Sequence, residues 1–158
     1  MTSECKYSLQ EAILKMESWC AYQDRCTFEV EQKLSSWYIT SENQEIILNH
    51  LRKTRFLDDN RFVESFVSGK FKIKHWGRIK IKHHLFQKHI DKIAIAEGLK
   101  AINEDEYFAT LKQLTQKKIT EKKTKEDIWS FKRRVMTYLS SKGYESDLIY
   151  EVVSETIK

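Results

Sequence analysis

Seven basic side chains stand in a stretch of 26 residues, 65–90, that contains no carboxylate. Four of the five histidines lie in the same stretch. Lysine and arginine side chains bind phosphate oxygens, and each phosphate that they neutralise releases condensed counterions. The stretch therefore predicts a polyanionic partner, and a solvated helix face is the alternative. The expected contact residues are Lys70, Lys72, Lys74, Arg78, Lys80, Lys82 and Lys88.

A second basic segment covers residues 112–134 and has nine bases against three carboxylates. Its central part, KKITEKKTK at 117–125, is predicted to be a polar connection between two helices. One interpretation is that Lys122, Lys123 and Lys125 contact DNA or an acidic protein surface. The other is a flexible solvated loop without a partner.

Trp76 stands inside the first basic stretch, between His75 and Gly77. An indole in such a place stacks on a nucleic-acid base or fits a pocket of a partner protein. More commonly it packs at the base of a helix pair. Both interpretations stay open from the residues alone.

Other kinds of site are not indicated. The four histidines of residues 65–90 have no carboxylate or thiolate nearby at metal-ligand spacing. Asp58 and Asp59 point to different faces, and an Asp before an amphipathic helix is typically an N-cap. No nucleotide-binding glycine loop, nucleophile elbow or Cys–His pair is visible. We expect no metal, no cofactor and no enzyme activity.

A short apolar pattern occurs three times at offsets of about fifty residues. Each copy has an apolar residue, a Leu four positions later, and a large apolar residue five positions after the Leu. The first two lie on one helix face, and the third follows a turn. The copies are Val30, Leu34 and Ile39; Ile81, Leu85 and Ile90; and Val135, Leu139 and Tyr144.

The elements that carry these residues are predicted to be helices throughout. The chain has no proline and four glycines, and its apolar residues recur at helical spacing. Helix starts are indicated by a Ser8/Glu11 capping box, by Asp58, and by Asn103. We expect an all-α fold of three three-helix repeats, 1–53, 54–102 and 103–158, in an elongated, curved array.

The composition favours a protein of the cytoplasm. Apolar residues make up 41% of the chain, the mean hydropathy is −0.60, and no run is long enough to span a membrane. The first residues do not form a signal peptide. Three cysteines without a CxxC pair indicate reduced thiols. Residues 1–51 are acidic, with eight carboxylates against four bases, so one face or edge of a monomer should be positive.

The middle third of the chain resembles the RecX family, the regulators of the bacterial RecA recombinase. The resemblance rests on an acidic opening, FLDDNRF, a glycine step into a basic helix, and the ending HLFQKHI. The matching residues are Phe56, Leu57, Asp58, Asp59, Phe62, Gly77, Ile81, Leu85, Lys88 and Ile90.

Three positions depart from the family pattern. Many members have proline after the glycine, where this chain has Arg78. Many have an acidic residue just before the Leu, where it has His84. The glycine of the last turn is replaced by His89, although the third repeat keeps Gly143 at that place.

The resemblance implies a regulator that binds the RecA–DNA filament along its groove, across neighbouring subunits, and usually lowers recombinase ATPase and strand exchange. Single- or double-stranded DNA would be a second partner, and a membrane is not expected. The residues by themselves indicate a basic helical repeat protein. Two alternatives therefore stay open, a stand-alone helical module that binds nucleic acid and a helical interaction scaffold whose positive face keeps it soluble.

Overall fold

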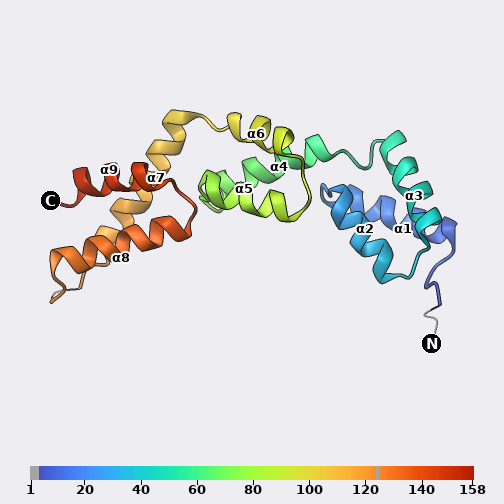
Figure 1. The fold of residues 1–158 in the computed structure, drawn as a ribbon, viewed down its shortest axis with the longest axis horizontal. Helices are drawn as coiled ribbons and strands as arrows, with labels where there is room; N and C mark the ends of the chain where they lie inside the picture. The colour runs from blue at the N-terminus through green and yellow to red at the C-terminus, as the bar shows by residue number, and fades with distance from the viewer. Residues whose placement is uncertain (1–3, 124) are drawn as a thin grey trace. The chain divides into compact units, whose positions relative to one another are not determined.

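The structure is a computed structural model and describes residues 4–123 and 125–158. In these residues the chain folds into α-helices and contains no strand (Figure 1), which confirms the predicted all-α class. The helices are α1 (Leu9–Tyr22), α2 (Thr27–Ser36), α3 (Ser41–Lys53), α4 (Asp59–Lys72), α5 (Arg78–Gln87), α6 (Lys92–Lys100), α7 (Glu104–Ile119), α8 (Ile128–Ser141) and α9 (Ser146–Thr156). None of these helices is long and apolar enough to cross a membrane.

Side-chain caps open several of the helices where the sequence predicts them. The Ser8 hydroxyl accepts from the backbone N–H of Glu11, whose carboxylate accepts from the backbone N–H of Ser8. The Asn103 side chain caps α7 by accepting from the backbone N–H of Glu106. Asp58 Oδ1 accepts from the backbone N–H groups of Asn60 and Arg61 in the first turn of α4, at 3.0 and 3.1 Å. Its carboxylate is therefore used in helix capping, as predicted.

The predicted three-fold pattern coincides with one kind of turn. Its nine apolar residues are all buried. The residue before the last member of each copy has a positive φ: 56° at Tyr38, 58° at His89 and 96° at Gly143. In the first and third copies, the next backbone N–H donates to the carbonyl of the pattern Leu, at 3.1 and 3.3 Å. This is the closure of a Schellman cap. His89 adopts the left-handed conformation although it is not glycine.

The chain divides into two compact units, residues 1–65 with 88–90, and residues 66–87 with 91–158. In the first unit, α1 and α2 pack against α3 around buried residues that include Met16, Leu34 and Leu51. The short segment 88–90 joins this unit through an ion pair from Lys88 to Glu29 on α2. The boundaries of the three predicted repeats stay a prediction.

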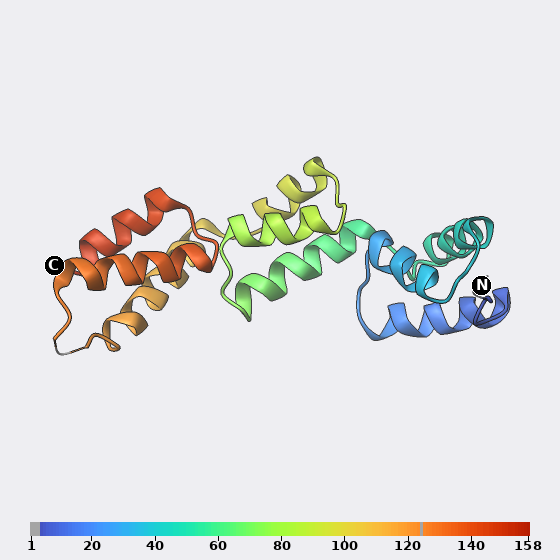
Figure 2. The ribbon, with the colours of Figure 1, turned by 60° about the horizontal axis from the view of Figure 1, so that its bottom comes forward.

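In the second unit, α5 packs against α6, and α7, α8 and α9 pack against one another (Figure 2). The largest buried side chains of α7, α8, α9 and the turns between them include Tyr107, Phe131 and Tyr144. Aromatic rings connect this interior to α4, since the Tyr107 and Tyr144 centroids lie 5.1 Å apart and Phe71 of α4 lies 5.8 Å from Tyr107.

Two glycines bring the start of α5 against the turn between α8 and α9. The backbone N–H of Gly77 donates to the carbonyl of Lys142 at 2.7 Å, and that of Ile79 donates to the carbonyl of Gly143 at 3.0 Å. A Cβ on Gly77 would overlap the backbone of Gly143, and a Cβ on Gly143 would overlap Lys80. This close approach is possible only because both residues lack a side chain.

Candidate nucleic-acid interface

Trp76 lies in the turn after α4, where its backbone N–H donates to the carbonyl of Lys70 at 3.0 Å. Its indole is half-buried. The Nζ atoms of Lys70 and Lys80 lie 4.8 and 4.5 Å from the ring centroid, and the His84 ring lies 4.6 Å away. The indole thus packs between helices and is also bordered by two cations, so features of both interpretations are present.

Lys142, which directly follows α8, adds a further cation to this group. Its Nζ donates to the carbonyl of Lys74 at 2.7 Å. Burial lowers the pKa of Lys142, and the charges of Lys80, Lys74 and Lys117 lower it further. In the described part of the chain, none of Lys70, Lys74, Lys80 and Lys142 forms an ion pair with a carboxylate. We call Trp76, Lys70, Lys74, Lys80 and Lys142 the Trp76 surface.

A surface of this composition suits a polyanion. Like charges held close together repel one another, and a phosphate group relieves this repulsion. The exposed part of an indole offers a face or edge to a base, as in proteins that bind single strands. The Trp76 surface contains Lys70, Lys74 and Lys80 from the predicted contact residues, and Lys142 is an addition that the sequence did not indicate.

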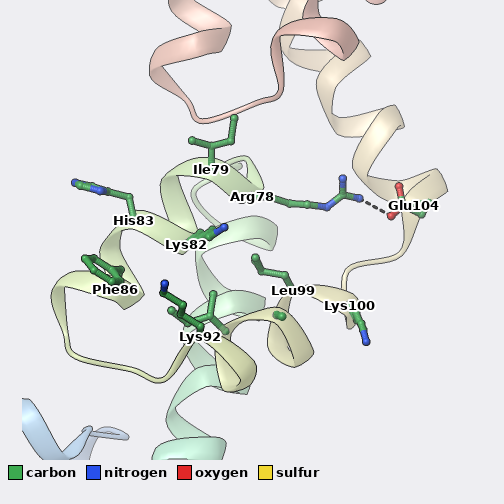
Figure 3. Close-up of a pocket in the computed structure, with 11 residues that line it drawn as sticks. Arg78, Ile79, Lys82, His83, Phe86, Lys92, Leu99, Lys100 and Glu104 are labelled. Atoms are coloured by element: carbon green, nitrogen blue, oxygen red, sulfur yellow. Dashed lines mark hydrogen bonds and ion pairs between the residues drawn. The ribbon is translucent and has the colours of Figure 1, made fainter.

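Arg78, one of the predicted contact residues, is paired with carboxylates of the chain itself, and its contact with a partner stays a prediction. It forms ion pairs with Glu104 at 2.6 Å (Figure 3) and with Glu145 at 3.4 Å, and its guanidinium lies 3.9 Å from the centroid of the Tyr107 ring. The Tyr107 hydroxyl in turn donates to Glu145 at 2.7 Å and accepts from the backbone N–H of Arg78 at 3.0 Å. Burial opposes the charge of Arg78, but its carboxylate partners outweigh this effect and raise its pKa. Arg78 therefore ties α5 to α7 and to the start of α9.

The other three predicted contact residues of the first basic stretch, Lys72, Lys82 and Lys88, do not belong to the Trp76 surface. Lys88 is paired with Glu29 at 3.4 Å, and this leaves its charge compensated. Lys72 and Lys82 are exposed and form no ion pair in the described residues. Lys82 comes from the side of α5 opposite to Lys80, because two residues correspond to about 200° of helical rotation.

The second basic segment is only partly a connection between helices. Helix α7 continues to Ile119, so residues 117–119 are helical. Lys122, Lys123 and Lys125 follow and are exposed. The nearby Glu121 and Glu126 are already paired with Lys118 and Arg134, respectively. Contact between the three exposed lysines and a partner stays a prediction.

Two histidine rings of the basic stretch lie against aromatic rings, and a third histidine contributes its backbone carbonyl. His84 lies against Trp76, His89 lies 4.2 Å from the Phe28 ring, and the His75 carbonyl accepts from the Tyr144 hydroxyl. Among the described residues, no three His, Cys, Asp or Glu side chains are placed to hold a metal ion.

Comparison with known proteins gives the chain its family. The family model of the second three-helix domain of RecX matches residues 58–99, and that of the third three-helix domain of RecX matches residues 104–153. The chain belongs to the RecX family. The two matched ranges together contain every predicted contact residue and the whole Trp76 surface.

Relatives from several bacteria carry the name regulatory protein RecX. The RecX of Clostridium botulinum (strain Eklund 17B / Type B) is 32% identical over 130 residues, which cover 82% of this chain and 60% of that protein. The RecX of Oceanobacillus iheyensis is 26% identical over 152 residues, covering 96% of this chain and 56% of that protein. The chain thus spans about three fifths of the length of these curated relatives.

Solved RecX structures share the fold. A crystal structure of regulatory protein RecX superposes with a TM-score of 0.82 at 24% identity, covering 93% of this chain and 73% of that one. RecX from Lactobacillus salivarius gives a TM-score of 0.81 at 22% identity, covering 93% of this chain and 95% of that one. At these identities the likeness establishes the helical fold.

Proposed function

We propose that this RecX family member regulates a RecA-type recombinase, and inhibits its activity, by binding the recombinase–DNA filament in its groove. The observation that carries the proposal is the Trp76 surface, a group of four lysines without carboxylate partners in the described residues, in a chain of this family. The surface would meet DNA phosphates or the acidic groove of the filament.

The mechanism is steric and electrostatic. Attraction between the lysines and the polyanion places the helical chain across neighbouring recombinase subunits. The bound chain then obstructs the changes in the filament that accompany ATP hydrolysis and strand exchange. No chemical step on the regulator is required.

A second candidate is binding of nucleic acid without the recombinase. It is supported by Lys70 and Lys80 beside a half-buried indole, an arrangement that combines phosphate contacts with base stacking. This activity would show itself as a strongly salt-dependent affinity for single-stranded DNA.

The test compares two charge-reversed triple variants. Lys70→Glu, Lys74→Glu and Lys80→Glu change the Trp76 surface. The matched control reverses three exposed cations from other parts of the chain, Lys53, Arg133 and Lys158, so that both variants carry the same net charge. Circular dichroism first verifies that both are folded. DNA-dependent ATP hydrolysis by RecA filaments is then measured against the concentration of each variant.

We expect the control to inhibit like the wild type and the Trp76-surface variant to inhibit only weakly. In a salt titration with DNA alone, the slope for the latter should become smaller by about one unit for each phosphate that is no longer neutralised. Equal inhibition by both variants would place the filament interface elsewhere, with Lys122, Lys123 and Lys125 as the next candidates. If the Trp76-surface variant lost DNA binding but still fully inhibited ATP hydrolysis by RecA, the Trp76 surface would serve DNA binding alone and the recombinase would be bound elsewhere.

A further inference from the structure

A groove of about 670 Å³ runs between α5 and α6 (Figure 3). One wall is a face of α5 that carries Ile79, Lys82 and Phe86, three and four residues apart and thus in one row along the helix. The facing wall is formed by Lys92 and Leu99 of α6, which are also on one helix face. Both walls belong to the second compact unit.

The groove has an exposed apolar lining. Ile79 is 53% exposed and Phe86 is 59% exposed, and Figure 3 shows Leu99 pointing toward the space between the helices. Ile95 supplies a buried floor. Exposed apolar side chains that share one groove often mark a surface for another molecule.

The charged lining of the same groove is positive. Lys82 on α5 and Lys92 on α6 are exposed and form no ion pair in the described residues. Glu104 is the one carboxylate among the described lining residues, and it is bound by Arg78 at 2.6 Å. Lys100 is paired with Glu97 at 3.0 Å. Two ammonium groups, one from each wall, are thus available beside the apolar lining.

From this combination we infer that the α5–α6 groove binds an acidic amphipathic segment of a partner protein. A helix laid in the groove would place an apolar row on Ile79, Phe86 and Leu99 and carboxylates against Lys82 and Lys92. Phe86 offers a ring to a nucleic-acid base, but Ile79, Ile95 and Leu99 are aliphatic, so the lining as a whole matches the apolar face of a helix better than stacked bases. The inference does not depend on the proposed recombinase function.

This groove and the Trp76 surface are separate sites on the same helix. Lys80 lies over Trp76, whereas Lys82 lines the groove, so changes at the two lysines affect different surfaces. The chain can therefore be tested for peptide binding with the Trp76 surface intact.

The probe is a fluorescein-labelled helical peptide of about 14 residues, about 21 Å long. It carries Leu at helical spacing on one face and Glu beside that face. Two control peptides replace every Glu by Gln, or every Leu by Ser. Fluorescence anisotropy with the full chain measures each affinity, and we expect only the peptide with both features to bind, with an affinity that falls as salt is raised.

The protein variants are Lys82→Glu with Lys92→Glu, and Phe86→Ser. The matched control is Lys72→Glu with Ile73→Ser, which changes an exposed lysine and a 75% exposed isoleucine outside the groove. Each groove variant should weaken binding of the acidic peptide by about tenfold or more, about 1.4 kcal/mol, and the control should leave it unchanged. Circular dichroism verifies that all variants are folded.

Three results would overturn the inference. The first is no binding of the acidic amphipathic peptide, and the second is equal binding by wild type and both groove variants. The third is displacement of the peptide by a single-stranded oligonucleotide whose own binding depends on Lys82 and Lys92. That last result would assign the groove to nucleic acid.

Discussion

The ammonium group of Lys142 is sensitive to the charge of the Trp76 surface. Burial lowers its pKa, and three other lysines lower it further. Its charged form is therefore less favourable here than in water, and a nearby anion would stabilise that form. The protonation of Lys142 is thus a probe of anion binding.

We predict that a bound oligothymidylate raises the pKa of Lys142. The anion stabilises the protonated amine of Lys142. The affinity for the oligonucleotide should therefore be greatest at pH values below the pKa that Lys142 has in the free protein, and it should fall as the pH rises through that pKa. Nζ chemical shifts followed by NMR during pH titrations, with and without the oligonucleotide, measure the change. Lys53, which is exposed and lies outside this surface, provides the comparison. Equal Lys142 titrations in both samples would contradict a phosphate contact at this residue.

Arg78 illustrates the opposite case, a cation whose partners lie within the protein. Removing its guanidinium by Arg78→Ala leaves the half-buried Glu145 with the Tyr107 hydroxyl but without its cationic partner, and leaves the buried Tyr107 ring without its cation. We expect a decrease of about 1–3 kcal/mol in the free energy of unfolding. Arg78→Lys should cause a smaller decrease, because the charge is kept while the planar fork is not.

Urea denaturation measures both decreases, and Lys72→Ala serves as the exposed control. A midpoint for Arg78→Ala equal to that of Lys72→Ala would show that the ion pairs with Glu104 and Glu145 contribute nothing to stability.

At the scale of the elements, a backbone contact holds the start of α5 against the α8–α9 turn. Gly77 and Gly143 allow the start of α5 to touch the α8–α9 turn, and Gly143 also has a φ of 96°. The same contact brings Lys142 beside Lys74 and Lys80. The Trp76 surface thus depends on two glycines that carry no charge themselves.

We predict that Gly77→Ala and Gly143→Ala each destabilise the chain, because the added Cβ overlaps backbone or side-chain atoms that must move. Gly69→Ala is the matched control, since it lies in α4 with nothing within 4 Å of the new methyl group. That change should stabilise by up to about 1 kcal/mol through the higher helix propensity of alanine. Thermal unfolding compares the three variants. Similar melting temperatures for all of them would contradict the close backbone approach.

The repeat pattern supplies a second prediction for the elements. Leu85 is fully buried, whereas its neighbour Phe86 is 59% exposed. Leu85→Ala should therefore cost about 2–5 kcal/mol, and Phe86→Ala should change stability by no more than about 0.5 kcal/mol. Chemical denaturation of the two variants measures the difference. A small effect at Leu85 would place that residue outside the core.

At the scale of the whole molecule, the proposed function predicts a dependence on the polymer state of the recombinase. A filament presents neighbouring subunits at fixed spacing, so a chain that contacts two of them gains from multivalency. We expect binding to RecA filaments to be roughly 100-fold tighter than binding to unassembled RecA. Anisotropy of the labelled chain, with DNA and a slowly hydrolysed nucleotide present or absent, measures both affinities. Equal affinities would favour a contact with a single subunit.

Much of the fold was predictable because its determinants are local. Helical spacing of apolar residues and the caps at Ser8, Asp58 and Asn103 act over a few residues, so they are visible in the chain as written. The buried Val30, Ile81 and Val135 also follow from a pattern within single helices and their turns. His89 shows that the turn does not require glycine at every copy.

The candidate site was predictable only in part, because its determinants are distant in sequence. The many lysines of residues 65–90 indicated a polyanionic partner. A count of charges cannot, however, distinguish Arg78 from Lys80, because both add one positive charge. Tertiary packing separates them: it pairs Arg78 with Glu145, 67 residues away, and leaves Lys80 over Trp76. It also brings Lys142 to Lys74 across 68 residues. Composition thus determined the sign of the surface, and long-range contacts decided which of its charges are available to a partner.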